Sequence, residues 1–403
     1  MISVAEARAR ILAALRPTAA EIVSLAEALG RVTAAPIQAR HDNPPGDVSA
    51  MDGYAVRAED AAEGAALRLI GAAPAGHPFA GHVGPGEAVR LFTGSLVPEG
   101  ANAILIQENA EIEGDARILV REAPARGRHI RRRAQDFAAG ETVLPAGQRL
   151  HPRAIGLAAA SGHPWLAVHR RPRVVLLCTG DEIALPGDPL PPGGVVSSNG
   201  PALAAFLRAC GAEPMLLPPV PDRLEAIGEA AEAARGADML VTTGGASVGA
   251  HDLVQEGLAA HGLTLDFWRI AMRPGKPLMH GRLGDVPMLG LPGNPVSALV
   301  CALLFLMPAI ERLQGLAGAP PPAEPVRLAA PLPANDIRED YVRASLLEPE
   351  EGGGWLAHPY LTQDSGQISR LAAADALIIR PPMAPAMPAG AMVPAIRLAP
   401  LGL

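Results

Sequence analysis

The chain has 403 residues, enough for roughly two to four domains. Its formal net charge of -7 disfavours nucleic acid as a partner, because nucleic-acid-binding proteins usually carry a basic excess. The amino terminus has no apolar signal core, and the apolar run 301–307 is too short to cross a bilayer, so we expect a cytoplasmic protein without a membrane partner.

The first residues predict two short helices. One begins near Ser3, and its apolar residues recur on one face as far as Leu15. A second is expected over 25–29. A third, over 154–161, is expected to rejoin these two, which predicts a discontinuous helical and linker domain formed by residues 1–40 and 143–172.

Residues 41–142 predict a small β domain inserted into the chain, because short apolar segments alternate there with glycines and prolines. Asp52 lies on the loop before a predicted strand at 54–56, and Thr93 follows another at 89–92. A loop aspartate is usually a cap or a turn residue, which is the alternative to a functional role for Asp52.

An arginine-rich stretch precedes Asp136, near the end of this β domain. A solvated loop is the alternative to a binding role for these arginines. Asp136 is then either a site residue or simply their ion-pair partner. The arginines are Arg126, Arg128, Arg131, Arg132 and Arg133.

Strands alternate with helices over 173–318, which predicts a three-layer α/β domain. Ligands of open α/β sheets bind beside the carboxyl ends of the strands. The expected strands are 173–177, 215–217, 239–241 and 289–291, and the expected helices are 202–209, 224–234 and 297–307. The three cysteines Cys178, Cys210 and Cys301 stand far apart in apolar surroundings, which predicts reduced, buried thiols.

Acidic and glycine-rich loops follow these predicted strands. Glycine lets backbone N–H groups approach an anion, although each loop alone is also typical of an ordinary turn. The loops are Thr179-Gly180-Asp181-Glu182, Asp222, Gly244-Gly245-Ala246-Ser247-Val248-Gly249 and Pro292-Gly293-Asn294-Pro295-Val296-Ser297, with Arg269, Arg273 and Lys276 between the last two.

Carboxylates without a nearby histidine or cysteine cluster suit Mg²⁺, held by one or two carboxylates and by phosphate oxygens. Arginine and lysine beside glycine-rich loops suit phosphate or another oxyanion. Together they indicate metal-assisted chemistry at a phosphate ester without a covalent nucleophile. The sequence has neither a Walker loop nor a serine nucleophile elbow.

A proline-rich linker at 320–325 separates the α/β domain from residues 326–403. Short strands spaced by turns predict that this last domain is a small β barrel.

Five motifs together resemble the molybdopterin molybdenumtransferase family, which includes the E domain of gephyrin. The resemblance covers nearly the whole chain. The motifs are Ser-Ala-Met-Asp-Gly-Tyr-Ala at 49–55, Phe-Thr-Gly-Ser at 92–95, Thr-Gly-Asp-Glu at 179–182, Gly-Gly-Ala-Ser-Val-Gly at 244–249 and Gly-Leu-Pro-Gly-Asn-Pro-Val-Ser at 290–297.

This resemblance implies that the chain inserts molybdate into adenylylated molybdopterin and releases AMP, with Mg²⁺ or alternatively Zn²⁺ as the cofactor. It also implies a homodimer in which the β domain of one subunit faces the α/β domain of the other. Molybdopterin adenylyltransferase is a further candidate partner.

The matching motifs imply which residues of this sequence form the site. Asp52, Thr93, Asp136 and Glu182 are expected to be catalytic, and Glu182 and Asp252 to hold the metal. Arg269 and Arg273 stand where the family often has lysine, which alters the geometry offered to an oxyanion. Substrate binding is expected from Thr179, Gly180, Asp181, Asp222, Gly244, Gly245, Ser247, Gly249, Asp252, Arg269, Arg273, Lys276, Pro292, Gly293, Asn294 and Ser297.

Two alternatives remain at this level. A molybdopterin adenylyltransferase shares the α/β core, but it would leave the first 150 residues without a purpose. A non-catalytic scaffold of the same fold would instead bind a partner through its last β domain.

Overall fold

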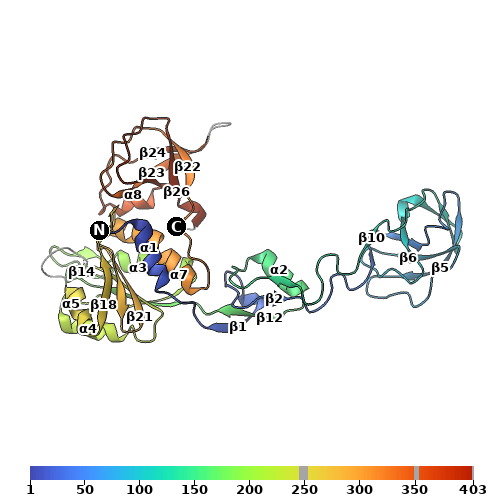
Figure 1. Cartoon of the computed structure of the whole chain (residues 1–403), viewed down its shortest axis with the longest axis horizontal. Helices are drawn as coiled ribbons and strands as arrows, with labels where there is room; N and C mark the ends of the chain where they lie inside the picture. Colours follow the sequence, from blue (N-terminus) through green and yellow to red (C-terminus); the bar gives the residue numbers. More distant parts are fainter. Residues whose placement is uncertain (245–252, 349–353, 402–403) are drawn as a thin grey trace. The chain divides into compact units, whose positions relative to one another are not determined.

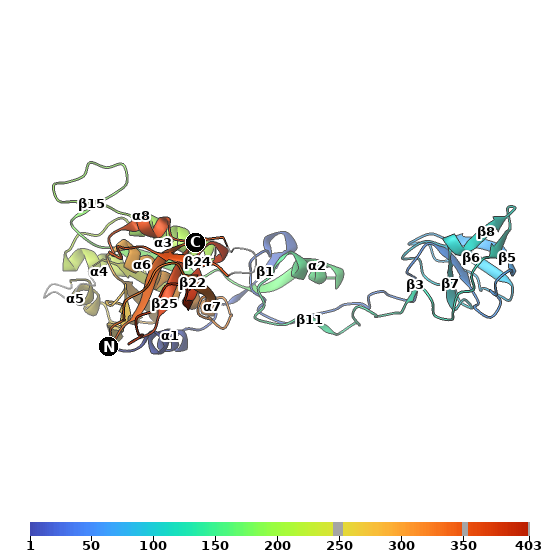
Figure 2. The ribbon, with the colours of Figure 1, turned by 90° about the horizontal axis from the view of Figure 1, so that it is seen from above.

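The computed structural model describes residues 1–244, 253–348 and 354–401. The chain folds into two compact units (Figures 1 and 2). The first, here called the α/β–barrel unit, comprises Met1–Glu21, Gly30–Ala34 and Ala167–Leu403. The second, here called the β unit, comprises Ile22–Leu29 and Ala35–Leu166.

A six-stranded sheet forms the centre of the α/β–barrel unit, in the order β16-β13-β17-β21-β20-β18. The first four of these strands are parallel, and the four strands expected from the sequence are confirmed. An antiparallel pair that the sequence did not reveal completes the sheet. The strands are β13 (Arg173–Cys178), β16 (Glu213–Leu216), β17 (Met239–Thr243), β18 (Leu263–Trp268), β20 (Met279–Leu283) and β21 (Val286–Leu291).

Helices cover both faces of this sheet, which confirms the three-layer prediction. Alternate residues of β13 point to opposite cores: Val174 and Leu176 to one, Val175 and Leu177 to the other. The first core contains α1 (Val4–Ala13), α3 (Asn199–Ala209), α6 (Pro295–Cys301) and α7 (Met307–Leu313), and the second contains α4 (Leu224–Glu232) and α5 (Leu253–Ala259).

Helices α6 and α7 are joined by a π-helical turn, η3 (Ala302–Leu306), so the helical segment runs from Pro295 to Leu313. It is longer than the sequence indicated. Among the described residues it is the one helix long and apolar enough to cross a membrane by length and composition alone. However, 78% of its most apolar stretch is buried inside the protein, as expected for a central core helix.

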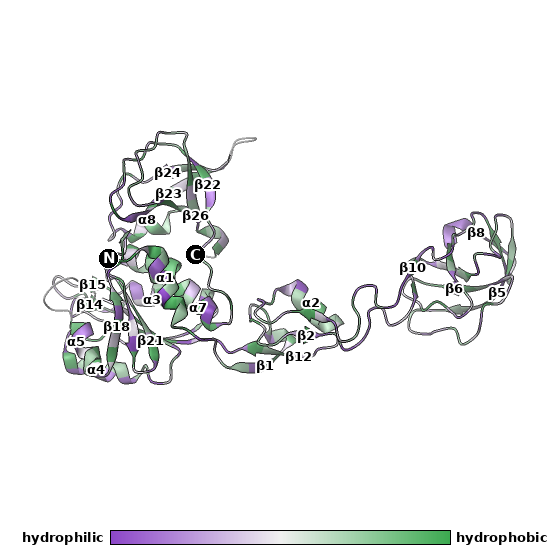
Figure 3. Cartoon of the chain, viewed as in Figure 1, coloured by the Kyte–Doolittle hydropathy of each residue, from purple (hydrophilic) through white to green (hydrophobic). Residues whose placement is uncertain are grey.

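The expected grouping of the first helix with residues 143–172 is wrong. Val4, Ala7 and Ile11 of α1 are buried in the same core as α7. Helix α1 carries both hydrophobic and hydrophilic residues (Figure 3), and it packs against η3 (Ala302–Leu306) and α7. Helix α2 (Pro152–Ala160) packs instead on β11 (Thr142–Leu144), and the expected helix at 25–29 is a short 3₁₀ turn, η1 (Leu25–Glu27).

The predicted carboxyl-terminal barrel is confirmed. It closes because β23 pairs with both β24 and β25. A short strand of the α/β domain, β19 (Met272–Arg273), adds in parallel to β23 and so ties the two domains of this unit together. The barrel strands are β22 (Glu324–Leu328), β23 (Glu339–Leu347), β24 (Leu356–Pro359), β25 (Ala376–Arg380) and β26 (Met392–Arg397), with α8 (Ile368–Ala372) and η4 (Ala399–Leu401) beside them.

The β unit is built on a second six-stranded sheet, ordered β7-β4-β6-β5-β9-β8. The two strands predicted at 54–56 and 89–92 are confirmed as β4 and β6. The sheet consists of β4 (Gly53–Val56), β5 (Ala66–Ala73), β6 (Glu87–Leu91), β7 (Ala103–Ile106), β8 (Ala110–Glu113) and β9 (Arg117–Val120), with the turn η2 (Gln107–Asn109).

Four two-stranded pairs complete the described structure. They are β1 (Ala20–Ser24) with β12 (Trp165–His169), β2 (Ile37–Gln38) with β11, β3 (Val48–Ser49) with β10 (Ile130–Arg131), and β14 (Ile183–Ala184) with β15 (Val195–Val196).

The three cysteines are free thiols, as expected. Cys178 and Cys301 are buried and Cys210 is half-buried. Burial raises the pKa of Cys178 to about 11, so this thiol is protonated and unreactive at neutral pH.

Candidate functional site

The loops after β13, β16, β17 and β21 meet at the carboxyl edge of the α/β sheet. The backbone N–H of Thr179 donates to the carbonyl of Thr243 over 3.2 Å. The N–H of Gly180 donates to the carbonyl of Val220 over 3.3 Å. The polar residues that the sequence placed after separate strands therefore lie along one edge.

Two glycines let these loops approach each other closely. Gly244 has a positive φ of +94°, and a Cβ placed on it would lie 2.3 Å from the carbonyl oxygen of Thr179. A Cβ on Gly293 would lie 3.6 Å from the Cα of Gly244. Gly244 therefore permits the loops after β13 and β17 to pack backbone against backbone, whereas a Cβ on Gly293 would make only an ordinary contact.

Asn199, at the start of α3, holds two of the loops together. Its Nδ2 donates to Thr243 Oγ1 over 2.8 Å and to the carbonyl of Gly293 over 2.7 Å. The sequence showed a polar Ser-Asn-Gly before α3, but it did not reveal this contact between distant loops.

Two polar atoms at this edge are buried and unpaired. Thr179 Oγ1 and Asn199 Oδ1 have no hydrogen-bond partner in the part of the chain that the structure describes. A buried polar atom without a partner is costly, so these two atoms are candidate contacts for a polar ligand.

The carboxyl-terminal barrel contributes a loop to the same edge, which sequence analysis missed. Asn294 Nδ2 donates to Ser365 Oγ over 2.9 Å, and the N–H of Val296 donates to the carbonyl of Ser365 over 3.1 Å. The fully buried guanidinium of Arg343 holds this loop by donating to the carbonyls of Asp364 and Gln367, over 2.9 and 3.1 Å.

Asp181, Glu182 and Asp222 form the acidic side of the edge. The N–H of Asp222 donates to Asp181 Oδ1 over 3.0 Å. Burial raises the pKa of Asp222, and repulsion from Asp181 and Glu182 raises it further. This repulsion would be relieved by a bound cation.

No group of three metal-ligating side chains is close enough to hold a metal ion among the residues at 1–244, 253–348 and 354–401. The carboxylates present fit Mg²⁺ in its usual arrangement with nucleotides, where one or two carboxylates act together with phosphate oxygens.

The three predicted cationic residues have different surroundings. The Arg269 guanidinium lies 4.5 Å from the centre of the Trp268 ring, and its buried Nε has no hydrogen-bond partner among the described residues. Arg273 Nε donates to Asp340 Oδ1 over 2.9 Å, so this side chain fastens the barrel to the α/β domain.

Lys276 is exposed and has no hydrogen bond or ion pair to its side chain within the described structure. It is also the only lysine in the chain, whose other basic residues are all arginine or histidine. Of the three predicted cations, Lys276 is therefore the most available to an anionic ligand.

In the β unit, Asp52 and Thr93 form a hydrogen-bonded pair. Asp52 Oδ1 accepts from the Thr93 N–H over 2.7 Å and from Thr93 Oγ1 over 2.8 Å. The backbone bond, and then the hydroxyl bond, lower the pKa of Asp52. Asp52 is thus a half-buried, ionised carboxylate fixed in one orientation.

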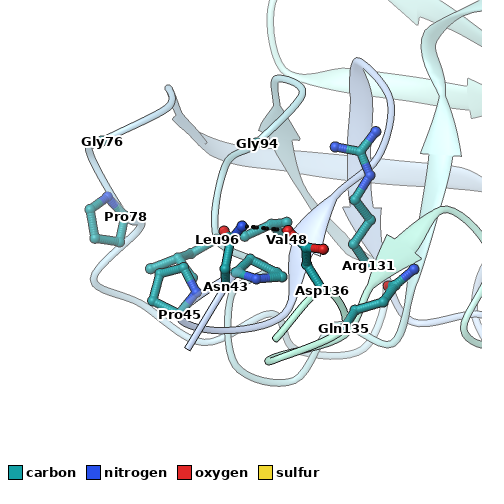
Figure 4. A pocket seen from close by; sticks show the side chains of 11 residues that line it. Asn43, Pro45, Val48, Gly76, Pro78, Gly94, Leu96, Arg131, Gln135 and Asp136 are labelled. Atoms are coloured by element: carbon teal, nitrogen blue, oxygen red, sulfur yellow. Dashed lines mark hydrogen bonds between the residues drawn. The ribbon is translucent and has the colours of Figure 1, made fainter. Parts of the chain in front are cut away.

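Asp136 is not the ion-pair partner of the arginines before it. Its Oδ2 accepts from Asn43 Nδ2 over 3.0 Å. Three of the neighbouring arginines pair elsewhere, and Asp136 faces a pocket of about 810 Å³ (Figure 4). These arginine pairs are Arg126 with Glu59, Arg132 with Asp47, and Arg133 with Asp42.

Comparison with known proteins identifies the family. The MoeA N-terminal region (domain I and II) matches residues 2–162, a probable molybdopterin binding domain matches 175–312, and the MoeA C-terminal region (domain IV) matches 325–398. A molybdopterin molybdenumtransferase from Nostoc sp. is 38% identical over 377 residues, or 90% of this chain and 85% of that protein. The chain belongs to the molybdopterin molybdenumtransferase family.

Other members of the family agree with this assignment. The Bacillus subtilis molybdopterin molybdenumtransferase is 33% identical over 392 residues, covering 94% of this chain and 90% of that protein. The molybdopterin biosynthesis MoeA protein of Pyrococcus horikoshii OT3 has a similar structure, with a TM-score of 0.85 at 27% identity over 99% of this chain and 100% of that chain. The resemblance found in the sequence motifs is confirmed.

Within this family fold, the structure places the predicted site residues in two groups, apart from the cations Arg269, Arg273 and Lys276 described above. One lies at the α/β edge, where Thr179, Gly180, Asp181, Glu182, Asp222, Gly244, Pro292, Gly293, Asn294 and Ser297 come together. The other lies in the β unit and comprises Asp52, Thr93 and Asp136. Four further predicted residues, Gly245, Ser247, Gly249 and Asp252, lie outside the residues that the structure describes.

Replacing Asp222 by asparagine is expected to stabilise the protein at neutral pH. Because the folded pKa is raised above the unfolded one, ionised Asp222 destabilises the fold above its folded pKa, and this cost vanishes as pH falls to about 3.9. The gain in free energy of unfolding at pH 7.5 should be a few tenths to about 1 kcal/mol, after allowance for solvent screening.

Urea unfolding of both proteins at pH 7.5 and pH 4.5 measures this gain. Asp188→Asn, at an exposed position, serves as the control and should leave the free energy of unfolding unchanged at both pH values. An Asp222→Asn protein that is less stable at pH 7.5 would show that no repulsion acts on this carboxylate.

Proposed function

We propose that this chain inserts molybdate into adenylylated molybdopterin, hydrolyses the adenylate and releases AMP. It is a transferase of molybdenum cofactor biosynthesis, and its relatives carry that activity in their name. The observation that carries the finer proposal is the α/β edge, where two buried unpaired polar atoms lie beside a group of carboxylates, and where Lys276 stands on the segment before β20, the neighbour of β21.

The edge is suited to an oxyanion. The unpaired Thr179 hydroxyl can donate a hydrogen bond to an anionic oxygen, whereas the unpaired Asn199 Oδ1 can only accept one from a donor group of the ligand. Lys276 supplies a mobile positive charge. These groups bind and orient the pterin phosphate and molybdate, while the Ser365 loop of the barrel closes the edge at α6.

Asp52 and Thr93 serve the hydrolytic step. Since the pKa of Asp52 is lowered, its carboxylate stays ionised at neutral pH and is a weak proton acceptor. Its role is therefore to orient a water molecule and to stabilise positive charge on it. Thr93 keeps the carboxylate in place through its two hydrogen bonds.

Mg²⁺, with Zn²⁺ as the alternative, is the proposed metal. Glu182 and Asp222 would hold it together with Asp252, and the donor set of carboxylates fits a hard cation. When bound, the metal neutralises charge on the phosphate oxygens.

The active protein is proposed to be a cytoplasmic homodimer. The two groups of site residues belong to different compact units. In the proposed dimer, the Asp52 group of one subunit would serve the α/β edge of the other. Molybdopterin adenylyltransferase would supply the adenylylated substrate.

The test is a single-turnover assay with purified protein, adenylylated molybdopterin and Mg²⁺. AMP should be released when molybdate is added and not when it is withheld. Consumption of ATP with molybdopterin alone would favour an adenylyltransferase. Absence of both reactions, in a protein that still binds molybdopterin, would favour a scaffold.

Replacing Lys276 by arginine is expected to lower molybdate-dependent AMP release about tenfold, although the charge is kept. A forked guanidinium presents its donors in a plane, whereas an ammonium group adapts to a tetrahedral anion as a point charge. The loss should appear mainly as a higher KM for molybdate. Lys276→Met, which removes the charge, should lower molybdate-dependent AMP release further.

Arg208→Lys, a charge-conserving change at an exposed position of α3, is the control and should keep full activity. Because Lys276 is the only lysine, it is the only side chain that an amine-directed reagent labels. Molybdate should slow this labelling. Equal labelling with and without molybdate would place the anion elsewhere.

A further inference from the structure

Arg90, a half-buried residue of β6, is a charged side chain of the β unit to which the proposed chemistry gives no role. It stands directly opposite Tyr54 in the antiparallel pairing of β4 with β6. Asp52 immediately precedes β4, and Thr93 closely follows β6. Because antiparallel strands bring the start of one beside the end of the other, Arg90 lies in the part of the sheet that carries both Asp52 and Thr93.

Two aromatic rings hold the guanidinium of Arg90. Its Cζ lies 4.8 Å from the centre of the Tyr54 ring and 5.4 Å from the centre of the Phe92 ring, and both distances suit a cation–π interaction. Tyr54 is buried in the core of this sheet, whereas Phe92 is 39% exposed and directly precedes Thr93. The guanidinium therefore fastens the chain just before Thr93 to a buried side chain.

Gln107 links Arg90 to the backbone of Asp52. Arg90 Nη2 donates to Gln107 Oε1 over 2.7 Å, and the Gln107 N–H donates to the carbonyl of Asp52 over 3.1 Å. The guanidinium is planar and carries five N–H donors, so one side chain can stack on rings and donate at its edge. Arg90 thereby contacts groups that fix both the Asp52 backbone and the segment before Thr93.

The charge of Arg90 also acts on the Asp52 carboxylate. The N–H of Thr93, and then its hydroxyl, are the main causes of the lowered pKa of Asp52, and the positive charge of Arg90 lowers this pKa further. Unlike Arg68 and Arg121, Arg90 forms no ion pair of its own among the residues that the structure describes. Its charge is therefore not neutralised by a carboxylate in direct contact.

We propose that Arg90 is a positioning residue for the reaction, and that it acts by fixing Asp52 and Thr93 relative to each other. Without the guanidinium, the segments that carry the pair lose a common anchor, and the Asp52 carboxylate orients its water molecule poorly. This inference rests on the proposed function, since it supports the hydrolytic step assigned to Asp52.

Molybdate-dependent AMP release by Arg90→Met and Arg90→Lys tests the proposal. Arg90→Met should lower the rate at saturating molybdate about tenfold, because a displaced group loses much of its effect. The KM for molybdate should stay unchanged, since the anion is assigned to the α/β edge. Arg90→Lys keeps the charge but not the planar fork, and it should recover only part of the rate. An unchanged rate in Arg90→Met refutes the proposal.

Two further variants control for other effects of the change. Arg117→Met, at an exposed position of β9 in the same sheet, should keep the full rate. Because Arg90 acts through Asp52, adding Arg90→Met to Asp52→Asn should cause no further loss. A further loss of about tenfold in this double variant would show that Arg90 acts independently of Asp52, and would overturn the proposal.

Hydrogen exchange of the full chain tests the positioning without any reaction. The amides of Thr93 and Gln107 both donate to Asp52, and they should exchange faster in Arg90→Met, while those of β8 and β9 stay unchanged. Faster exchange throughout the sheet would overturn the proposal in favour of a purely structural role, and unchanged exchange at both amides would refute it. The expected local change in a chain that releases no AMP with molybdate would refute the proposed function and leave the positioning by Arg90 standing.

Discussion

Replacing Asp52 by alanine is expected to lower molybdate-dependent AMP release by about a hundredfold or more, within the range seen when a group that orients a proton transfer is removed. Asp52 is half-buried and accepts two hydrogen bonds from Thr93, so its carboxylate stabilises a turn and is not part of a hydrophobic core. The folded state should therefore survive the change. The rate of AMP release under saturating molybdate is the measurement.

Two further variants separate charge from geometry at this position. Asp52→Asn retains an oxygen that accepts from Thr93 but loses the negative charge, so it should be nearly as inactive as alanine. Asp115→Asn, an exposed carboxylate in the same unit, should keep full activity. Full activity in Asp52→Asn would mean that the residue only shapes the turn, which is the ordinary role of a loop aspartate.

The α/β core could be predicted from the sequence because its parallel strands are buried on both faces. Continuous apolar runs such as 239–241 leave few alternatives to a buried strand. The outer pair β18 and β20 was missed, because β18 alternates between exposed and half-buried or buried residues and contains Thr264 and Asp266. The periodicity of α1 showed that one face is buried but not which surface covers it, and the predicted grouping was therefore wrong.

Only those parts of the candidate site that lie within local sequence motifs could be predicted. Loops after parallel strands share one edge by geometry, so Thr179, Asp222 and Gly244 could be grouped in advance. Asn199 and Ser365 were missed because their importance lies in contacts with residues far along the chain. Arg273 was taken for an anion ligand, but only the folded structure reveals its hydrogen bonds with the Asp340 carboxylate.

Replacing Gly244 by alanine is expected to have the other large effect. A Cβ at this position would lie 2.3 Å from the carbonyl oxygen of Thr179, and its φ of +94° is strained for any residue with a side chain. The loop after β17 must then move away from β13, which disrupts the place proposed to bind the oxyanion. Molybdate-dependent AMP release should fall at least tenfold, and the free energy of unfolding by about 1–3 kcal/mol.

Gly236 provides a matched control for the Gly244 substitution. Both changes put a side chain at a positive φ, but only the change at Gly244 also creates a steric clash. Gly236 also has a positive φ, +77°, in the same unit, but nothing lies within 4 Å of an added Cβ. Gly236→Ala should cost about 1 kcal/mol from backbone strain alone and leave AMP release unchanged. Since only Gly244→Ala adds the clash with Thr179, the difference between the two variants measures how closely the two loops must approach for activity. Equal activity in both variants would mean that this close approach plays no part in the reaction.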